Sequence, residues 1–374
     1  MKNILSLYII GFLFIQIPFH IAAASEAVKF SSVEWPKTDF NKHNISFDEI
    51  LSGGPPKNGI PAIDKPRFVK SDNAKKWLKP LEPVIAIKLG SEAKAYPLQI
   101  LMFHEIVNDV LNGQAIAVTF CPLCNSSMVF SRKVNGRTLD FGTTGRLRNS
   151  DLIMYDRQTE SWWQQFTGEG LIGFYTDTEL TELTSNIISF QAFQQHYPNG
   201  KILSRETGFS RQYGKNPYRG YDDINNTPFL MRGPIDTRLP PMERVLSVKI
   251  SDQQKLYPFS TIDDSTIIHD KFNGQPLVIF KTGDIYSALD QYNIDDSKKV
   301  SAYSVFSTTL NSKQLHFYFE DKTIKDRETK SEWSVVGKAV KGKLKGKQLP
   351  ALSHGIHFAF AWLAFNPNVE IFKP

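Results

Sequence analysis

The chain has 374 residues, of which 41% are hydrophobic and 12% aromatic, so it has enough apolar material for more than one core. It carries 44 lysines and arginines against 38 aspartates and glutamates, a formal net charge of +6, but the two signs alternate along the chain. Because the basic residues are not interleaved with aromatic ones and no nucleic-acid motif is present, the sequence argues against nucleic-acid binding.

The first 24 residues have the pattern of a secretory signal peptide. Lys2 precedes an apolar run over residues 4–19, and three alanines at 22–24 offer a cleavage site. No later stretch is apolar enough to cross a membrane, so we expect no integral membrane segment after signal cleavage. The mature chain is therefore predicted to be soluble and exported, in an oxidising periplasmic or extracellular compartment.

Beyond an irregular N-terminal segment, residues 25–83, the chain repeats itself. VIAIKLGSEAKAYPLQILMFHEIVNDVLNGQ (84–114) aligns without a gap on VLSVKISDQQKLYPFSTIDDSTIIHDKFNGQ (245–275), with ten identical positions. DRQTESWW (156–163) recurs as DRETKSEW (326–333). The sequence therefore predicts a duplication: a first repeat lobe over 84–203, an ordered connecting strap over 204–244, and a second, degenerate lobe over 245–374.

Within each repeat, short runs of β-type residues dominate. Asn-Gly pairs at 112–113, 135–136 and 273–274 favour tight hairpins. A helical pattern occurs near the end of each repeat, at 187–196 and 356–364. We therefore expect an α+β, β-rich fold of two pseudo-symmetric, mostly antiparallel lobes.

The first repeat holds the only two cysteines of the chain, Cys121 and Cys124, in a C-x-x-C spacing that lets two thiolates reach one metal ion. If Asn112-Gly113 closes a two-residue hairpin, His104 faces Cys121; if residues 99–110 are helical, this pairing fails. We hypothesise a transition-metal site with these three ligands, copper or zinc being the best candidates. Met128 as a fourth ligand would favour copper, whereas Glu105 or water would favour zinc or iron.

Two other functions remain open. A thiol–disulfide oxidoreductase would use Cys121 as nucleophile and Cys124 as resolving thiol. A non-enzymatic module for an envelope partner would bind through the tyrosine-rich strap and keep the cysteines as a disulfide staple. The second repeat has replaced every candidate residue, which argues for a function over a staple: His104, Glu105, Cys121 and Cys124 correspond to Ser265, Thr266, Thr282 and Ile285.

Further polar candidates lie in GRLRNSDLIMYDRQTESWW, residues 145–163. Arg146, Asn149 and Asp151 occupy a loop before a predicted strand, where they would form an outer shell of the metal site or contact an unknown small-molecule substrate. The sequence does not decide whether the protein is an enzyme.

Five stretches together resemble one protein family: SGGPPKNGIPAIDKPRF, AYPLQILMFHEIVND, VTFCPLCNSSMVF, GRLRNSDLIMYDRQTESWW and LPPMERVLSV. It is the set of exported bacterial and archaeal proteins that carry domain of unknown function number 3179, and the resemblance covers residues 50–371. One departure is Asn125, where the family usually has a small residue after the second cysteine. The resemblance implies export and a common pattern for the His-Glu and C-x-x-C elements, but no established activity.

Overall fold

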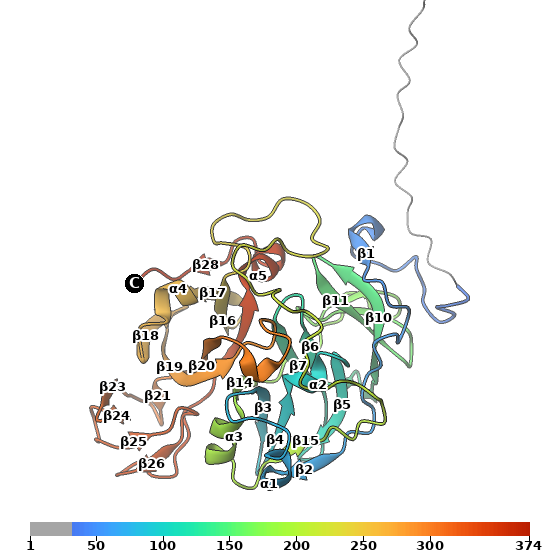
Figure 1. Cartoon of the computed structure of the whole chain (residues 1–374). Helices are drawn as coiled ribbons and strands as arrows, with labels where there is room; N and C mark the ends of the chain where they lie inside the picture. The colour runs from blue at the N-terminus through green and yellow to red at the C-terminus, as the bar shows by residue number, and fades with distance from the viewer. Residues whose placement is uncertain (1–31) are drawn as a thin grey trace, which may run out of the picture.

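A computed structural model describes residues 32–374 (Figure 1). These residues form 28 strands, five short α-helices and two 3-10 helices, and nearly all strand pairs are antiparallel. The β-rich, mostly antiparallel architecture expected from the sequence is therefore confirmed. The predicted signal peptide, residues 1–24, lies outside the described residues. None of the helices in the described part is long and apolar enough to cross a membrane.

The sheets of the first half are built around hairpins, and one strand, β15, lies parallel to its neighbour β4. In spatial order, the first sheet contains β14 (Asn186–Ser189), β3 (Pro83–Leu89), β4 (Glu92–Pro97), β15 (Lys201–Leu203) and β2 (Phe68–Lys70). The second contains β5 (Ile106–Leu111), β6 (Gln114–Cys121) and β7 (Ser126–Ser131), followed by the pair β8 (Lys133–Val134) and β9 (Arg137–Thr138). The last contains β1 (Ile50–Ser52), β10 (Phe141–Arg148), β11 (Asp151–Asp156), β12 (Trp162–Gln164) and β13 (Gly170–Ile172).

The second half presents sheets in the same order and also has one parallel pair, here formed by its edge strand β28 with β17. The first contains β27 (Ser353–Phe358), β16 (Arg244–Ile250), β17 (Gln253–Pro258) and β28 (Glu370–Ile371). The second contains β18 (Ile267–Phe272), β19 (Gln275–Tyr286) and β20 (Lys299–Ser307), followed by the pair β21 (Thr309–Leu310) and β22 (Lys313–Gln314). The last contains β23 (Phe317–Glu320), β24 (Thr323–Asp326), β25 (Glu332–Trp333) and β26 (Ala339–Lys341).

The helices are short. They are α1 (Ser71–Ala74), α2 (Leu98–Leu101), α3 (Phe190–His196), α4 (Phe259–Ile262) and α5 (Ala359–Phe365), with 3-10 helices η1 (Phe47–Glu49) and η2 (Ile294–Asp296). Two of them in the first half, α2 and α3, correspond in position to α4 and α5 in the second. The predicted helices at 187–196 and 356–364 begin three residues later than expected. Their first residues belong to β14 and β27, because Ile187 and Ile188 pair with Ile85 and Val84 in the sheet.

The predicted Asn-Gly hairpins are present. Asn112 and Gly113 have φ of 49° and 78°, the left-handed values of a type I′ turn, and they join β5 to β6. Asn273 and Gly274 do the same between β18 and β19, with φ of 46° and 75°. These turns set the register of both hairpins. In the first hairpin, Cys121 is the last residue of β6, at the end of the strand away from the turn.

The two halves pack through one shared hydrophobic core. It contains Phe120 and Tyr96 from the first half together with Tyr257 and Phe358 from the second, all fully buried. The buried ring of His357 joins the halves as well, since its two nitrogens lie 3.0 Å from Ser126 Oγ and 3.0 Å from Ser247 Oγ. The core therefore continues across the boundary between the predicted repeats.

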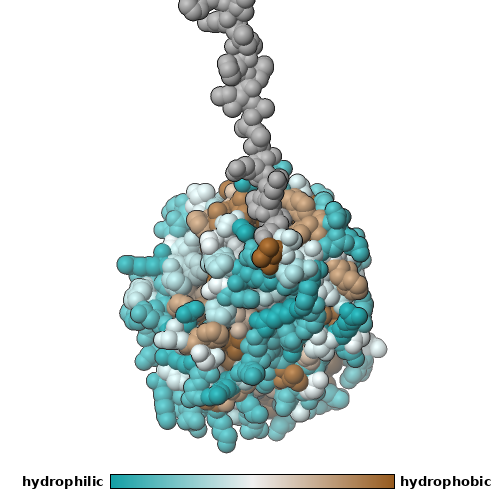
Figure 2. Space-filling view, turned by 90° about the vertical axis from the view of Figure 1, so that its right-hand side faces the viewer, coloured by the Kyte–Doolittle hydropathy of each residue, from teal (hydrophilic) through white to brown (hydrophobic). Residues whose placement is uncertain are grey.

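Residues 204–243, the strap, link β15 to β16 without a helix or strand of their own. The strap is drawn in yellow in Figure 1 and runs between the two halves. It ends one residue earlier than predicted because Arg244 already belongs to β16. In Figure 2, hydrophilic residues dominate the visible face and hydrophobic ones are scattered among them.

Glu82, at the entrance to β3, is a buried acid on which stability should depend. Its side chain is 4% exposed, and its oxygens accept hydrogen bonds from the Lys79 amide and from Gln99 Nε2. Burial raises the pKa of Glu82 from 4.5 to about 7, although these hydrogen bonds and Arg205 act to lower it. The Glu82 carboxyl therefore ionises at a lower pH in the unfolded chain than in the folded one.

The stability that Glu82 contributes is complete below pH 4.5 and is lost as the pH rises to about 7. We expect the Glu82→Gln variant to lack this dependence. Between pH 4.5 and about 7 the unfolding free energy of wild type should therefore fall by on the order of 2 kcal/mol more than that of the variant. Urea unfolding at several pH values measures this. The exposed Glu206→Gln variant should follow wild type at every pH; parallel curves for wild type and Glu82→Gln would contradict the assignment.

Candidate functional site

The C-x-x-C turn connects β6 to β7 and is buried. Cys121 is the last residue of β6 and pairs with Ser126, the first of β7. Asn125 has a φ of 49° and its amide donates to the Pro122 carbonyl at 3.2 Å, so the turn needs a residue that tolerates the left-handed region. Asparagine does, which explains how it replaces the small residue that is usual in the resembled family. Cys121 is 2% exposed and Cys124 is 0% exposed.

Asp151 is brought to the two thiols by the neighbouring sheet. It is the first residue of β11, after a turn in which Asn149 and Ser150 have φ of 51° and 68°. One carboxylate oxygen of Asp151 and the sulfur atoms of Cys121 and Cys124 all lie within 4.8 Å of one another. Within the described residues, this is the only group of three or more His, Cys, Asp or Glu side chains so arranged.

The Asp151 carboxylate is held from one side only. Its Oδ2 accepts hydrogen bonds from Gln164 Nε2 at 2.7 Å and from the Phe166 amide at 3.0 Å. Its Oδ1 is buried and accepts no hydrogen bond from a nitrogen or hydroxyl group of the described residues, so on this side the carboxylate has only the thiols of Cys121 and Cys124 as donors. A thiol is a weak donor, so a buried carboxylate oxygen that faces thiols alone is poorly satisfied.

The surroundings of this cluster disfavour negative charge on all three of its groups. Burial raises the pKa of Asp151 to about 7, against the hydrogen bonds from Gln164 and Phe166 that lower it. Burial also raises the pKa of Cys121, and raises that of Cys124 well above its ordinary value. A bound cation would favour the ionised form of all three groups at once.

His104 lies away from this cluster. Its ring is buried, with Nδ1 2.7 Å from the Pro61 carbonyl oxygen and Nε2 2.6 Å from the Tyr213 hydroxyl. The β5–β6 register runs from Leu111 paired with Gln114 back to Ile106 paired with Thr119, and stops there. The last paired residue of β5 is therefore Ile106, two positions short of His104, and the predicted pairing of His104 with Cys121 is not formed.

Glu105 is the reason why the ladder stops. It has a φ of 56°, and its amide donates to the Leu101 carbonyl at 2.6 Å, so it closes the turn that follows helix α2 in a left-handed conformation that glycine adopts most easily. For a residue with a side chain this conformation costs about 1 kcal/mol. Glu105 is 7% exposed, and burial raises its pKa to about 8, with a further contribution from the nearby Asp151 carboxylate.

The remaining predicted residues surround the cluster at different distances. Met128 lies in β7 opposite Thr119, two residues along the ladder from the pair of Cys121 with Ser126. Arg146, in β10, lines a cavity of about 690 Å³. Asn149 lies in the turn before Asp151 and shapes the backbone there.

This cavity lies between the first half and the strap. Glu105 and Leu123 line it from the first half, and strap residues 217–221 with Phe229 line it from the other side. Burial raises the pKa of Tyr218 above its ordinary range, and the charges of Glu105 and Cys121 add to the effect. Burial likewise raises the pKa of Tyr221 to about 12, with contributions from both cysteines. The two tyrosines therefore lie close to the acid and the thiols.

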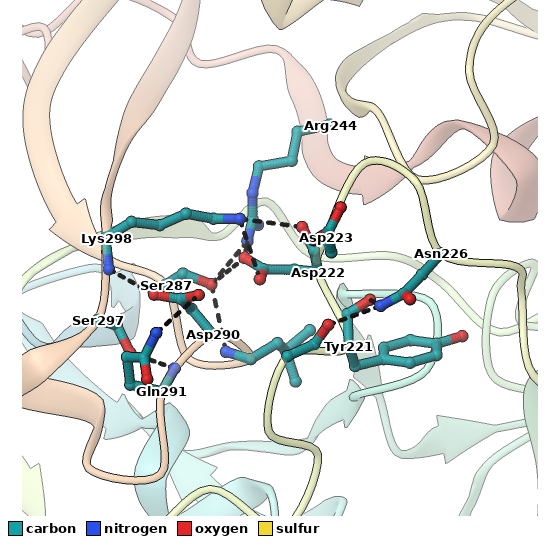
Figure 3. A network of polar contacts seen from close by, with 12 residues as sticks. Tyr221, Asp222, Asp223, Asn226, Arg244, Ser287, Asp290, Gln291, Ser297 and Lys298 are labelled. Atoms are coloured by element: carbon teal, nitrogen blue, oxygen red, sulfur yellow. Dashed lines mark hydrogen bonds and ion pairs between the residues drawn. The ribbon is translucent and has the colours of Figure 1, made fainter.

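A polar network holds this part of the strap against the second half (Figure 3). The Asp222 side chain is 0% exposed; its Oδ2 lies 2.7 Å from Arg244 Nη2 and accepts a hydrogen bond from Ser287 Oγ, and its Oδ1 lies 3.1 Å from Lys298 Nζ. The amide of Gly220 donates to the Asp290 carbonyl at 2.6 Å. The second half thereby fixes the strap wall of a cavity whose other walls belong to the first half.

Comparison with known proteins gives one family match, to the model described as "Protein of unknown function (DUF3179)", over residues 57–369. No curated protein and no solved structure matches the chain. The matched region includes the C-x-x-C turn, Asp151, the strap and most of the second half. Since it covers most of the chain, the protein belongs to this family of proteins of unknown function.

Proposed function

We propose that the protein binds one transition-metal ion, best fitted by zinc, through Cys121, Cys124 and Asp151. The observation that carries the proposal is the buried carboxylate of Asp151, which lies beside both sulfur atoms and has an Oδ1 with no nitrogen or hydroxyl donor among the described residues. Ionising these three buried groups together is unfavourable unless a cation is bound among them.

The donor atoms favour zinc over copper. Two thiolates and one carboxylate oxygen suit a borderline ion, whereas the histidine that would favour copper is not part of the three-residue group. Three protein ligands leave a further coordination position, which water would take in a tetrahedral zinc site. Leu123, between the two cysteines, and Glu105 both line the cavity described above.

Dithiol–disulfide exchange is supported less well. Such an enzyme needs an accessible thiolate with a lowered pKa. Here burial raises the pKa of both thiols, and neither cysteine is more than 2% exposed. The observations therefore favour a metal ligand role for Cys121 and Cys124.

Cobalt substitution tests the metal site directly. Metal-free, untagged protein titrated with Co²⁺ under reducing conditions is expected to take up a single equivalent, with a thiolate-to-cobalt charge-transfer band that Zn²⁺ abolishes by displacement. Saturation without a thiolate band would contradict the proposed ligands. Protein that binds no cobalt but forms a readily reducible disulfide would favour the oxidoreductase, and one with a resistant disulfide would favour the binding module.

We also propose that the chain is exported and that its halves arose by duplication. The signal-peptide pattern of residues 1–24 supports export, and the repeated order of sheets and Asn-Gly turns supports duplication. On this view the second half has kept the framework and lost the site. Its retained role is to hold the strap over the cavity of the first half.

A further inference from the structure

A second binding site is indicated by the cavity itself and does not depend on a metal. Its volume of about 690 Å³ is large enough for a small organic molecule. Leucine side chains from β10 and β11, Leu147 and Leu152, line it together with the aromatic rings of Tyr218, Tyr221 and Phe229 from the strap. Most of a ligand in this space would therefore contact apolar or aromatic groups.

Glu105 is the unusual group in this cavity. Its side chain is 93% buried, and its carboxylate has no hydrogen bond or ion pair with any described residue although it borders the cavity. The backbone conformation at this position favours glycine, so the fold gains nothing from a glutamate there. An acid that is strained, buried and unpaired at the wall of a cavity is explained by a partner that the cavity receives.

The charges around Glu105 indicate the sign of that partner. The charge that acts on the Glu105 carboxylate is that of Asp151, which is also negative. Arg146 and Arg219 also border the cavity, but Arg219 is exposed, and burial raises the pKa of Glu105 with no opposing effect of either guanidinium. A ligand with a positive charge or hydrogen-bond donors would therefore be favoured at Glu105, and an anionic one disfavoured.

The strap supplies the complementary surface for such a ligand. Aromatic faces attract a cation that lies within about 6 Å of the ring centre. Tyr218 and Glu105 border the same cavity. A single ligand group could then contact the carboxylate and an aromatic ring together.

We propose that this cavity binds a small organic amine, with its ammonium group at Glu105 and its apolar body between the β10–β11 leucines and the rings of the strap. The proposal does not require a metal at the cysteines, because Glu105 is outside the proposed ligand set. The strap, fixed by Asp222, forms the aromatic wall of the site.

Calorimetric titration with 2-phenylethylamine tests this site, with 3-phenylpropionate as a probe of similar size and opposite charge. Wild-type protein is expected to bind the amine and not the carboxylate. Glu105→Gln should weaken amine binding by about tenfold or more, since a charge-assisted contact is lost. The exposed strap variant Glu206→Gln should bind like wild type.

A second variant covers the case in which Glu105→Gln does not fold. Thr227 is an exposed strap residue that lines the cavity, and Thr227→Trp should fill the space and abolish amine binding. Equal affinity of wild type and Glu105→Gln, stronger binding of the carboxylate, or no amine binding by wild type would overturn the proposal. Metal content measured on each sample shows separately whether the cysteine site is intact.

Discussion

Replacing Cys124 with serine is expected to reduce the bound metal from a single ion per chain to background. A serine hydroxyl remains protonated at neutral pH and is a poor ligand for zinc, so one of three donors is lost. The loss of affinity should exceed the roughly 100-fold that removal of an outer-shell partner costs. Elemental analysis of the purified variant, followed by competition with a zinc chelator, measures both quantities.

Two further variants separate the proposed ligand set from the one predicted by the sequence. Asp151→Asn keeps the shape of the side chain but removes its charge, and should also lose metal. His104→Ala should keep it, because the ring of His104 contacts Pro61 and Tyr213 rather than the sulfurs. Loss of metal in His104→Ala, with retention in Asp151→Asn, would restore the histidine as the third ligand.

Removing the Asp222 carboxylate is expected to cause the largest loss of stability outside the core. Asp222→Ala leaves Arg244, whose side chain is 11% exposed, without its buried partner. Such a loss costs about 3–5 kcal/mol, and the lower end applies here because Lys298, at 46% exposed, can be resolvated. Urea unfolding measures the change, and amide hydrogen exchange should show faster exchange over residues 217–229.

The adjacent acid provides a matched control for this experiment. Asp223 is exposed, and its Oδ1 accepts hydrogen bonds only from Asn225. Asp223→Ala should therefore change the unfolding free energy by no more than about 0.5 kcal/mol. Equal effects of the two substitutions would mean that the network in Figure 3 does not hold the strap.

The helix boundaries show where local pattern and tertiary pairing disagree. Residues 187–189 and 356–358 share the apolar spacing of the helices that follow them, so the sequence predicts continuous helices. In the structure they complete β14 and β27, because Ile187 and Ile356 gain sheet partners that only the folded chain provides. Pairing with a buried strand outweighs weak helix propensity over three residues.

The parts of the candidate site that depend on residues close in sequence were predictable. The C-x-x-C pair, the Asn112-Gly113 hairpin and the relevance of Asp151 follow from short-range signals. The replacement of His104 by Asp151 beside the sulfurs does not, because a single left-handed residue, Glu105, ends the ladder before the histidine. Glutamate is uncommon in the left-handed conformation, and no sequence pattern around Glu105 predicts it.

The sequence alone was sufficient for the β-rich class, the hairpin registers and the family, since these depend on alternation, turn residues and motif order within short stretches. Only the tertiary structure decided which acid lies beside the thiols, where the cavity is and what closes it. Those contacts join residues 27 or more positions apart, such as Cys124 with Asp151 and Asp222 with Lys298. Their geometry is set by how sheets pack and where backbone strain is tolerated, which no local pattern encodes.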